Sequence, residues 1–283
     1  MDFHLFRLYT FPSNQFSLFG KERTRVEVLR TTFERLAAKK PVDQRWNVGN
    51  ARAVNYNVTF FRIGKIRIRH GEQYVDGKFI DYDAPDALST YCFIDFEEGL
   101  LAIAKRSMLG RDSTQLVAHR LREMLQRVFK GHGGEPEFEI ESIPDPVKFL
   151  QQLEDASYIR KFFVTFLRPN PINVDQLLTA PMNSLIKVAT AERTHVEIMG
   201  PDLKKEVLTE ITRDAAARGA DASAHIVKGR RRVFIKLRES SATVNVAGID
   251  SDDADIIADV WSKIERSFNR VRGSRTKDRR KKR

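Results

Sequence analysis

Segments with two different spacings of apolar residues alternate along this chain, and these spacings constrain its fold more than any single motif does. Some segments alternate apolar and polar residues, which is typical of half-buried β-strands, and others repeat apolar residues every three or four positions, which predicts amphipathic helices. The clearest predicted strands are 3–11, 56–69, 91–96, 100–105, 135–143 and 158–167. The clearest predicted helices are 22–38, 112–130 and 252–271. Strands and helices interleaved in this way predict an α+β fold with mostly antiparallel pairing.

Weaker patterns complete the predicted order of elements. A strand near 73–80 follows the first long strand, with a turn predicted at His70-Gly71. A hairpin is expected around Glu97-Glu98-Gly99. In the second half we expect helices at 173–188 and 202–218, and strands at 194–199, 232–237 and 242–246, of which the last two pair with each other.

Pro144-Asp-Pro146 interrupts the pattern near the middle of the chain. With 283 residues the chain is long enough for two domains. We therefore predict two sheet-and-helix domains, 1–143 and 144–271. The second ends in the closing amphipathic helix, and a disordered basic tail, 272–283, follows it.

Composition limits the setting of the protein. Cys92 is the only cysteine, so an intramolecular disulfide is impossible and a reducing compartment is expected. No apolar run reaches the roughly 18 residues that span a bilayer. Because the N-terminus also lacks the pattern of a secretory signal, we predict a cytoplasmic protein.

Motifs for catalysis are sparse. The sequence has no phosphate-binding loop, dinucleotide fingerprint or zinc-protease helix, and it suggests no cofactor and no metal, so a non-enzymatic protein is the leading interpretation. One alternative is a metal-dependent nuclease, in which Asp95, Glu97 and an aspartate of the segment Asp81–Asp86 hold Mg²⁺ near Lys105. Aspartate and glutamate also form ordinary turns, which explains the same residues without a metal.

The last twelve residues carry eight Lys or Arg and one Asp, which supplies +7 of the formal net charge of +11. A flexible cationic segment attached to a folded body is suited to binding polyanions, of which nucleic acid is the commonest. A tail that only increases solubility is the alternative interpretation.

Further basic residues occur in groups along the body. Side chains at alternate positions of a strand point to one face about 7 Å apart, a spacing close to that of neighbouring phosphates. Phosphate contacts give affinity without sequence information, so these groups predict sequence-independent binding of double-stranded DNA. An adaptor whose tail contacts another polyanion remains a further alternative. The predicted DNA-binding residues are Lys65, Arg67, Arg69, Lys105, Arg106, Arg111, Lys263, Arg266, Arg270, Arg272, Arg275, Lys277, Arg279, Arg280, Lys281, Lys282 and Arg283.

The hairpin Tyr91–Ala104, the following loop with the helix from Asp112, and the closing helix Ala254–Val271 resemble those of the RexA-like phage exclusion proteins. The resemblance implies a homodimer similar to the recombination-associated RdgC fold, which clamps double-stranded DNA without sequence preference. It also implies a role in anti-phage defence by exclusion or abortive infection, or in the nucleoid, and a membrane effector protein encoded nearby as a further partner. The strongly basic tail of this chain departs from that pattern.

Overall fold

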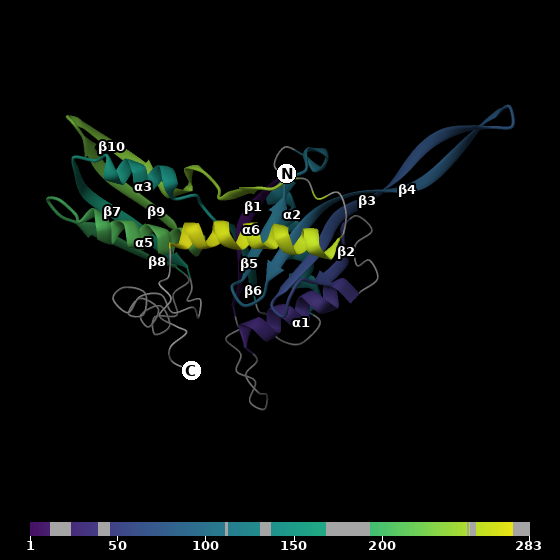
Figure 1. Ribbon diagram of the computed structural model, residues 1–283, viewed down its shortest axis with the longest axis horizontal. Helices are drawn as coiled ribbons and strands as arrows, with labels where there is room; N and C mark the ends of the chain where they lie inside the picture. The colour runs from purple at the N-terminus through teal and green to yellow at the C-terminus, as the bar shows by residue number, and fades with distance from the viewer. Residues whose placement is uncertain are drawn as a thin grey trace.

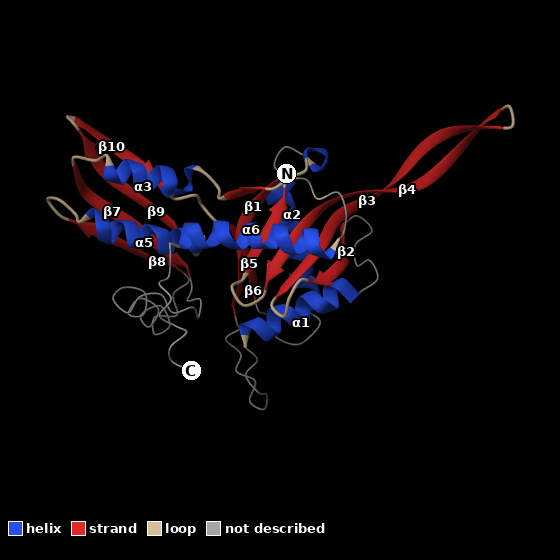
Figure 2. Cartoon of the chain, viewed as in Figure 1, coloured by secondary structure: helices blue, strands red, loops and turns tan. Residues whose placement is uncertain are grey.

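In the computed structural model the chain has an α+β fold with two mostly antiparallel sheets, which confirms the predicted fold class (Figures 1 and 2). The structure describes residues 1–11, 24–38, 46–110, 113–130, 137–167, 193–247, 249 and 253–273. The predicted helix 173–188 and the tail 274–283 lie outside these residues.

The first sheet has the strand order β11-β1-β5-β4-β3-β2, and β6 pairs with β1 as well. All of its pairings are antiparallel. Its strands are β1 (Asp2–Phe11), β2 (Trp46–Ala53), β3 (Val58–Val75), β4 (Lys78–Asp95), β5 (Leu100–Ala104), β6 (Glu137–Ser142) and β11 (Thr243–Asn245).

Helices cover both faces of this sheet, because strand alternation sends large apolar residues to both sides. On one face Phe61 and Cys92 pack with helices α1 (Arg25–Ala38) and α2 (Ser113–Lys130). On the other face Phe60 and Phe93 pack with the closing helix α6 (Ala254–Arg272), whose Trp261 ring lies 5.9 Å from that of Phe93.

The second sheet has the order β10-β9-β7-β8 and carries helices α3 and α5 on one face. Its apolar core joins that of α6 and the first sheet. The predicted domain boundary lies between β6 and α3, yet β11 and α6 return from beyond it to the first sheet. The elements of this part are α3 (Val147–Glu154), β7 (Tyr158–Leu167), β8 (Arg193–Met199), α5 (Lys205–Ala217), β9 (Asp221–Lys228), β10 (Arg231–Lys236) and the short 3-10 helix η2 (Leu237–Glu239). Another short 3-10 helix, η1 (Ser107–Leu109), follows β5.

A long hairpin of β3 and β4 projects from the first sheet (Figure 1). The predicted turn at His70-Gly71 is wrong, because both residues continue β3 and the chain reverses at Asp76-Gly77. Asp76 and Gly77 both have positive φ, at 51° and 80°, as expected for the tight turn that Asp-Gly favours. We call residues 66–87, which extend beyond the rest of the sheet, the arm.

The predicted pairing of 232–237 with 242–246 is also wrong. β10 pairs with β9, whereas β11 pairs with β1. The pattern did not predict β2, β9 or α3. The helix predicted at 202–218 begins at Lys205, and Asp202 instead accepts a hydrogen bond from the backbone N–H of Ile159, at 3.3 Å.

Candidate nucleic-acid interface

The arm carries the first group of predicted DNA-binding residues. Lys65, Arg67 and Arg69 occupy alternate positions of β3 and are exposed, so their side chains leave the same face of the ribbon. Arg67 donates two hydrogen bonds to Asp86 on the opposite strand, at 2.9 and 3.0 Å. Lys65 and Arg69 form no ion pair with any residue in the described ranges. We call these three cations the row.

The two faces of the arm differ in charge. Residues directly opposite each other in β3 and β4 share a face, so the pairing register assigns every side chain. The face of the row, which we call the cationic face, holds Lys65, Arg67, Arg69 and Lys78 against one carboxylate, Asp86. The opposite face, which we call the acidic face, has no Lys or Arg and carries Glu72, Asp81 and Asp83. The row therefore faces solvent on a surface that attracts anions.

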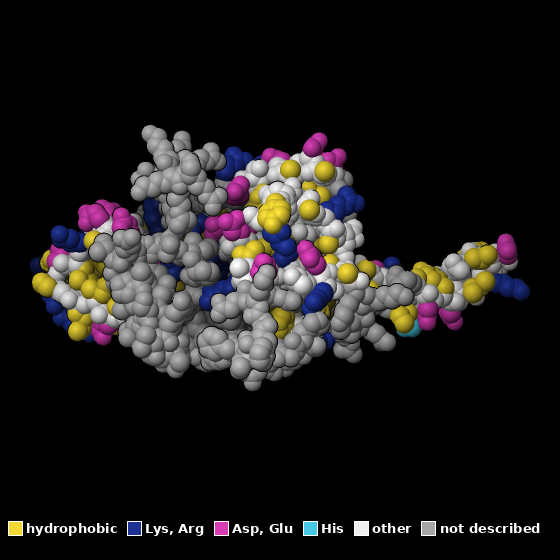
Figure 3. Space-filling view, turned by 90° about the horizontal axis from the view of Figure 1, so that it is seen from below, with side chains coloured by type: hydrophobic (Ala, Val, Ile, Leu, Met, Phe, Trp, Pro, Cys, Tyr) yellow, Lys and Arg dark blue, Asp and Glu magenta, His cyan; other side chains and the backbone are white. Residues whose placement is uncertain are grey.

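The arm also exposes large apolar side chains along its length (Figure 3). Phe79 is 76% exposed and Tyr74 is 65% exposed, and their rings lie 5.0 Å apart near the tip. Ile66, Ile68, Val75, Ile80 and Tyr82 are exposed as well. Such a concentration of apolar side chains on a projecting element is typical of an interaction surface.

Arg106 lies at the base of the arm but on the other face of the sheet. It donates to the backbone carbonyl of Ser89 at 2.8 Å, and its guanidinium lies 5.6 Å from the Tyr91 ring centroid. Arg62, which the pattern did not single out, lies 4.5 Å from the same centroid and donates to the Tyr91 hydroxyl at 2.6 Å. Tyr91 packs in the core on the side that α6 covers. Lys105 is exposed after β5, and Arg111 lies outside the described residues.

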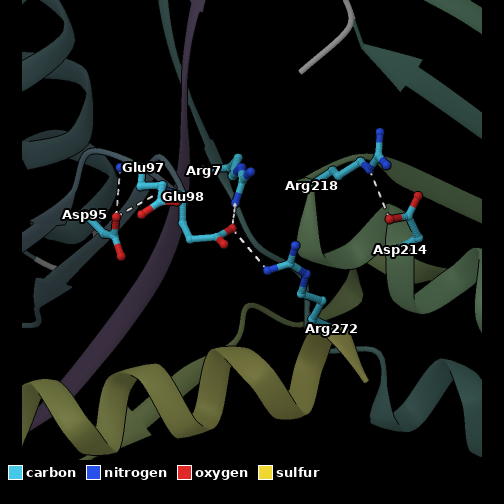
Figure 4. Close-up of polar contacts among 7 residues, drawn as sticks. All are labelled: Arg7, Asp95, Glu97, Glu98, Asp214, Arg218 and Arg272. Carbon is cyan, nitrogen blue, oxygen red and sulfur yellow. Dashed lines mark hydrogen bonds and ion pairs between the residues drawn. The ribbon is translucent and has the colours of Figure 1, made fainter. Parts of the chain in front are cut away.

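The basic residues of α6 do not join the row. Lys263 pairs with Asp259 at 2.7 Å, and Arg266 and Arg270 are exposed. The helix α6 and the row lie on opposite faces of the first sheet. The predicted DNA-binding residues of α6 and of the arm therefore form separate surfaces. The prediction that Arg272 belongs to a free DNA-binding tail is wrong. Its side chain is only 13% exposed and pairs with Glu98 at 3.1 Å (Figure 4). It holds the end of α6 against the turn between β4 and β5, so it is not part of a free tail.

The predicted magnesium ligands are far apart. Asp81, Asp83 and Asp86 lie along the arm, whereas Asp95 ends β4 inside the body. Nine or more residues of extended strand separate them from Asp95, a distance of about 30 Å or more. Asp95 accepts hydrogen bonds from the backbone N–H groups of Glu97 and Glu98, at 2.9 and 3.0 Å, and so caps the turn (Figure 4). This set of carboxylates cannot hold one metal ion.

Burial raises the pKa of Asp95 to about 6, although the two backbone donors act in the opposite direction. No group of three or more potential metal ligands occurs within the described part of the chain.

A feature that the sequence analysis missed lies on the second sheet, on the face away from α3 and α5. Phe163 on β7 stacks against His195 on β8, with centroids 5.6 Å apart, and lies 5.8 Å from His225 on β9. The His225 ring is in turn 4.8 Å from that of Phe234 on β10, which is 47% exposed. These four rings, which we call the ring face, come from all four strands. Single-sequence patterns cannot show this row, because it depends on which strands are neighbours.

Comparison with protein-family models gives no match for this chain. Comparison with curated protein sequences gives none either. Among the described residues, no helix has both the length and the apolar content that a membrane crossing requires.

Proposed function

We propose that this chain is a homodimer that binds double-stranded DNA without reading its sequence. The observation that carries the proposal is the row on the cationic face of the arm. An exposed row of alternate-position cations is suited to contacting phosphates at a regular spacing, and a two-stranded ribbon has the size that the major groove admits. The basic tail adds affinity as a second, separate attachment.

The test is a binding titration by fluorescence anisotropy, with one labelled duplex, a scrambled duplex and a matched RNA, over a range of salt concentrations with Mg²⁺ present. We expect equal affinity for both duplexes and a steep fall of affinity with salt. Alanine at both Lys65 and Arg69 should flatten the dependence of log K on log salt by about 0.9 for each phosphate that is no longer neutralised. The matched control is alanine at Lys148 and Lys228, exposed cations outside the arm, of which Lys228 already pairs with Asp155.

Equal salt slopes for the two double variants would contradict the role of the row. Shortened DNA strands would instead favour the nuclease alternative, with ligands other than the separated carboxylates. Binding of neither duplex nor RNA would favour the adaptor alternative.

Removal of residues 274–283 tests the tail. The cut follows Gly273 because Arg272 is part of the folded body. We expect weaker binding at low salt and unchanged thermal unfolding. The role in anti-phage defence belongs to the same proposal, and phage plating efficiency on cells that produce the wild type or the Lys65 and Arg69 double variant measures it.

The ring face supports a second candidate function, binding of single-stranded nucleic acid. Exposed aromatic and imidazole rings on a sheet are suited to stacking with bases. Lys236 lies 5.6 Å from the Phe234 ring centroid and supplies a cation beside the rings. Phe234→Ala should weaken binding of single strands by about 1–3 kcal/mol and leave duplex binding unchanged. Equal binding of single strands by variant and wild type would remove this candidate.

A further inference from the structure

The arm is a two-stranded ribbon with unpaired strand edges. β2 pairs with β3 only as far as Lys65, and β5 pairs with β4 only from Cys92 onward. Between these points, within the described residues, each strand of the arm has one neighbour, the other strand. An isolated two-stranded hairpin is marginally stable in water, and an open edge is a template for another strand. The arm therefore favours the addition of a further strand.

The two edges differ in how they are protected. The edge of β4 carries Pro85, which has no N–H to donate to a ladder, together with Lys78 and the three aspartates Asp81, Asp83 and Asp86. Proline is one of the devices by which natural edges avoid pairing. The open part of β3, like that of β4, carries charges of both signs, but it has no proline. Pairing is therefore favoured at β3.

The sequence of the β3 edge is self-complementary about Gly71. If two copies pair antiparallel with Gly71 opposite itself, His70 faces Glu72 of the second copy, and Ile68 faces Tyr74 of the second copy. Histidine can donate a hydrogen bond to a carboxylate, and a pair of an aromatic with a β-branched residue stabilises antiparallel strands. The symmetry repeats each pair, so every favourable contact occurs twice.

Other symmetric registers do not form these pairs. A shift of two residues one way places His70 opposite itself and Ile68 opposite Glu72. The same shift the other way places Glu72 opposite itself and Ile68 opposite Asp76. The register about Gly71 also uses the whole open edge, because Ile66 then lies opposite Asp76 at the tip of the second arm.

We propose that two copies of this chain join through the β3 edges of their arms, in an antiparallel pair centred on Gly71 that forms one four-stranded sheet. This inference rests on the homodimer of the proposed function and names its interface. In the joined sheet residues opposite each other share a face, so the rows of both copies lie on the same side. Together the two rows present six cations over about 40 Å of strand, whereas a single arm presents only three.

The first experiment is disulfide trapping of the full-length chain without DNA. Residues opposite each other in an antiparallel pair have Cα atoms about 4.5–5.5 Å apart, within the range of a disulfide. Gly71→Cys, made like its control in a Tyr82→Ala background because the Tyr82 ring lies 3.0 Å from the place of a Cβ at residue 71, should therefore form a covalent dimer on mild oxidation. Cys92 is fully buried and does not compete. The matched control is Gln73→Cys, on the same strand and face, because its two copies are about 13 Å apart along the joined strands and should not link.

The second experiment is sedimentation equilibrium without DNA. Ile68→Asp places a carboxylate beside Glu72 and Asp76 of the second copy, so the dimer dissociation constant should rise at least about tenfold. Ala87→Asp adds the same charge to the same face of the arm but on β4, and it should leave the dimer unchanged.

Trapping through Gln73→Cys but not Gly71→Cys, or a dimer unaffected by Ile68→Asp, would overturn this interface. Both experiments are done without nucleic acid, so a failure of the proposed interface can be distinguished from a failure of DNA binding. A trapped dimer that binds no duplex would contradict the proposed function alone.

Discussion

The roles of single arginines in this protein depend on what surrounds them. Arg7 is 3% exposed in the core, where burial lowers its pKa, and Arg272 is nearly buried at the end of α6. Both guanidinium groups contact one carboxylate, that of Glu98, at 3.9 and 3.1 Å. Glu98 therefore connects β1, the turn after β4 and the closing helix. Sequence alone places Arg272 in the basic tail, because charge in a sequence carries no information about burial.

Glu98→Gln should destabilise the folded state by about 1–3 kcal/mol, because it leaves two buried cations without their counter-charge. Urea unfolding at pH 7 measures this change. Glu97→Gln is the matched control, since Glu97 occupies the same turn, is exposed and accepts a hydrogen bond from Asn57 that glutamine can also accept. Equal stability of the two variants would show that Glu98 is not required to neutralise Arg7 and Arg272.

Asp95 gives a prediction about pH. Burial raises its pKa from 3.8 to about 6, so between these values the folded protein binds a proton that the unfolded chain has released. The contribution of Asp95 to the free energy of unfolding therefore falls as the pH rises from about 4 to 6. Asp95→Asn cannot ionise, and its amide oxygen still accepts from the backbone of the turn.

The free energy of unfolding of the variant should equal that of the wild type at pH 4 and exceed it by about 1–2 kcal/mol at pH 7. This difference is smaller than the full pKa shift implies, because Asp95 is partly exposed. Urea unfolding at both pH values measures the difference. A difference between variant and wild type that is the same at both pH values would contradict the assigned pKa.

At the scale of elements, the periodic patterns predicted most of the long strands and helices correctly. The arm was missed for a local reason: His70-Gly71 resembles a turn, whereas Gly71 only leaves room for the Tyr82 ring, whose nearest atom is 3.0 Å from the place of a Cβ. The partners of β10 and β11 were missed because proximity in sequence does not determine long-range pairing. The row was predicted as a strand face, but its separation from the basic residues of α6 depends on which face of the sheet α6 covers.

The arm should be separable from the body. Its exposed side chains contribute nothing to either core cluster, and Arg67 and Asp86 form a paired rung at its base. Replacement of residues 68–85 by Asn-Gly should therefore form a tight turn between Arg67 and Asp86. We expect the melting temperature of the shortened protein to stay within a few degrees of the wild type. The salt dependence of duplex binding should become less steep, because Arg69 and Lys78 are lost while Lys65, Arg67 and the tail remain. A large fall in the melting temperature would show that the arm supports the body.

At the scale of the whole molecule, α6 unites the two sheets. Trp261, Ile264 and Phe268 share a continuous buried cluster with residues of the first sheet and with α5 and the second sheet. A boundary predicted from a proline-rich stretch cannot reveal this arrangement, because it arises from the return of the chain after β10. The two sheets are therefore expected to unfold as one cooperative unit.

Trp261→Ala tests that cooperativity. Removal of a buried aromatic side chain should cost about 3–5 kcal/mol, and because Trp261 belongs to the buried cluster that both sheets share, both should be destabilised by the same amount. Hydrogen exchange resolved by segment measures each sheet separately. Ile256→Ala, in the same helix but 40% exposed, should leave both sheets unchanged. If β7 and β9 keep their protection while β1 and β5 do not, α6 belongs to the first sheet alone and the two sheets are independent folding units.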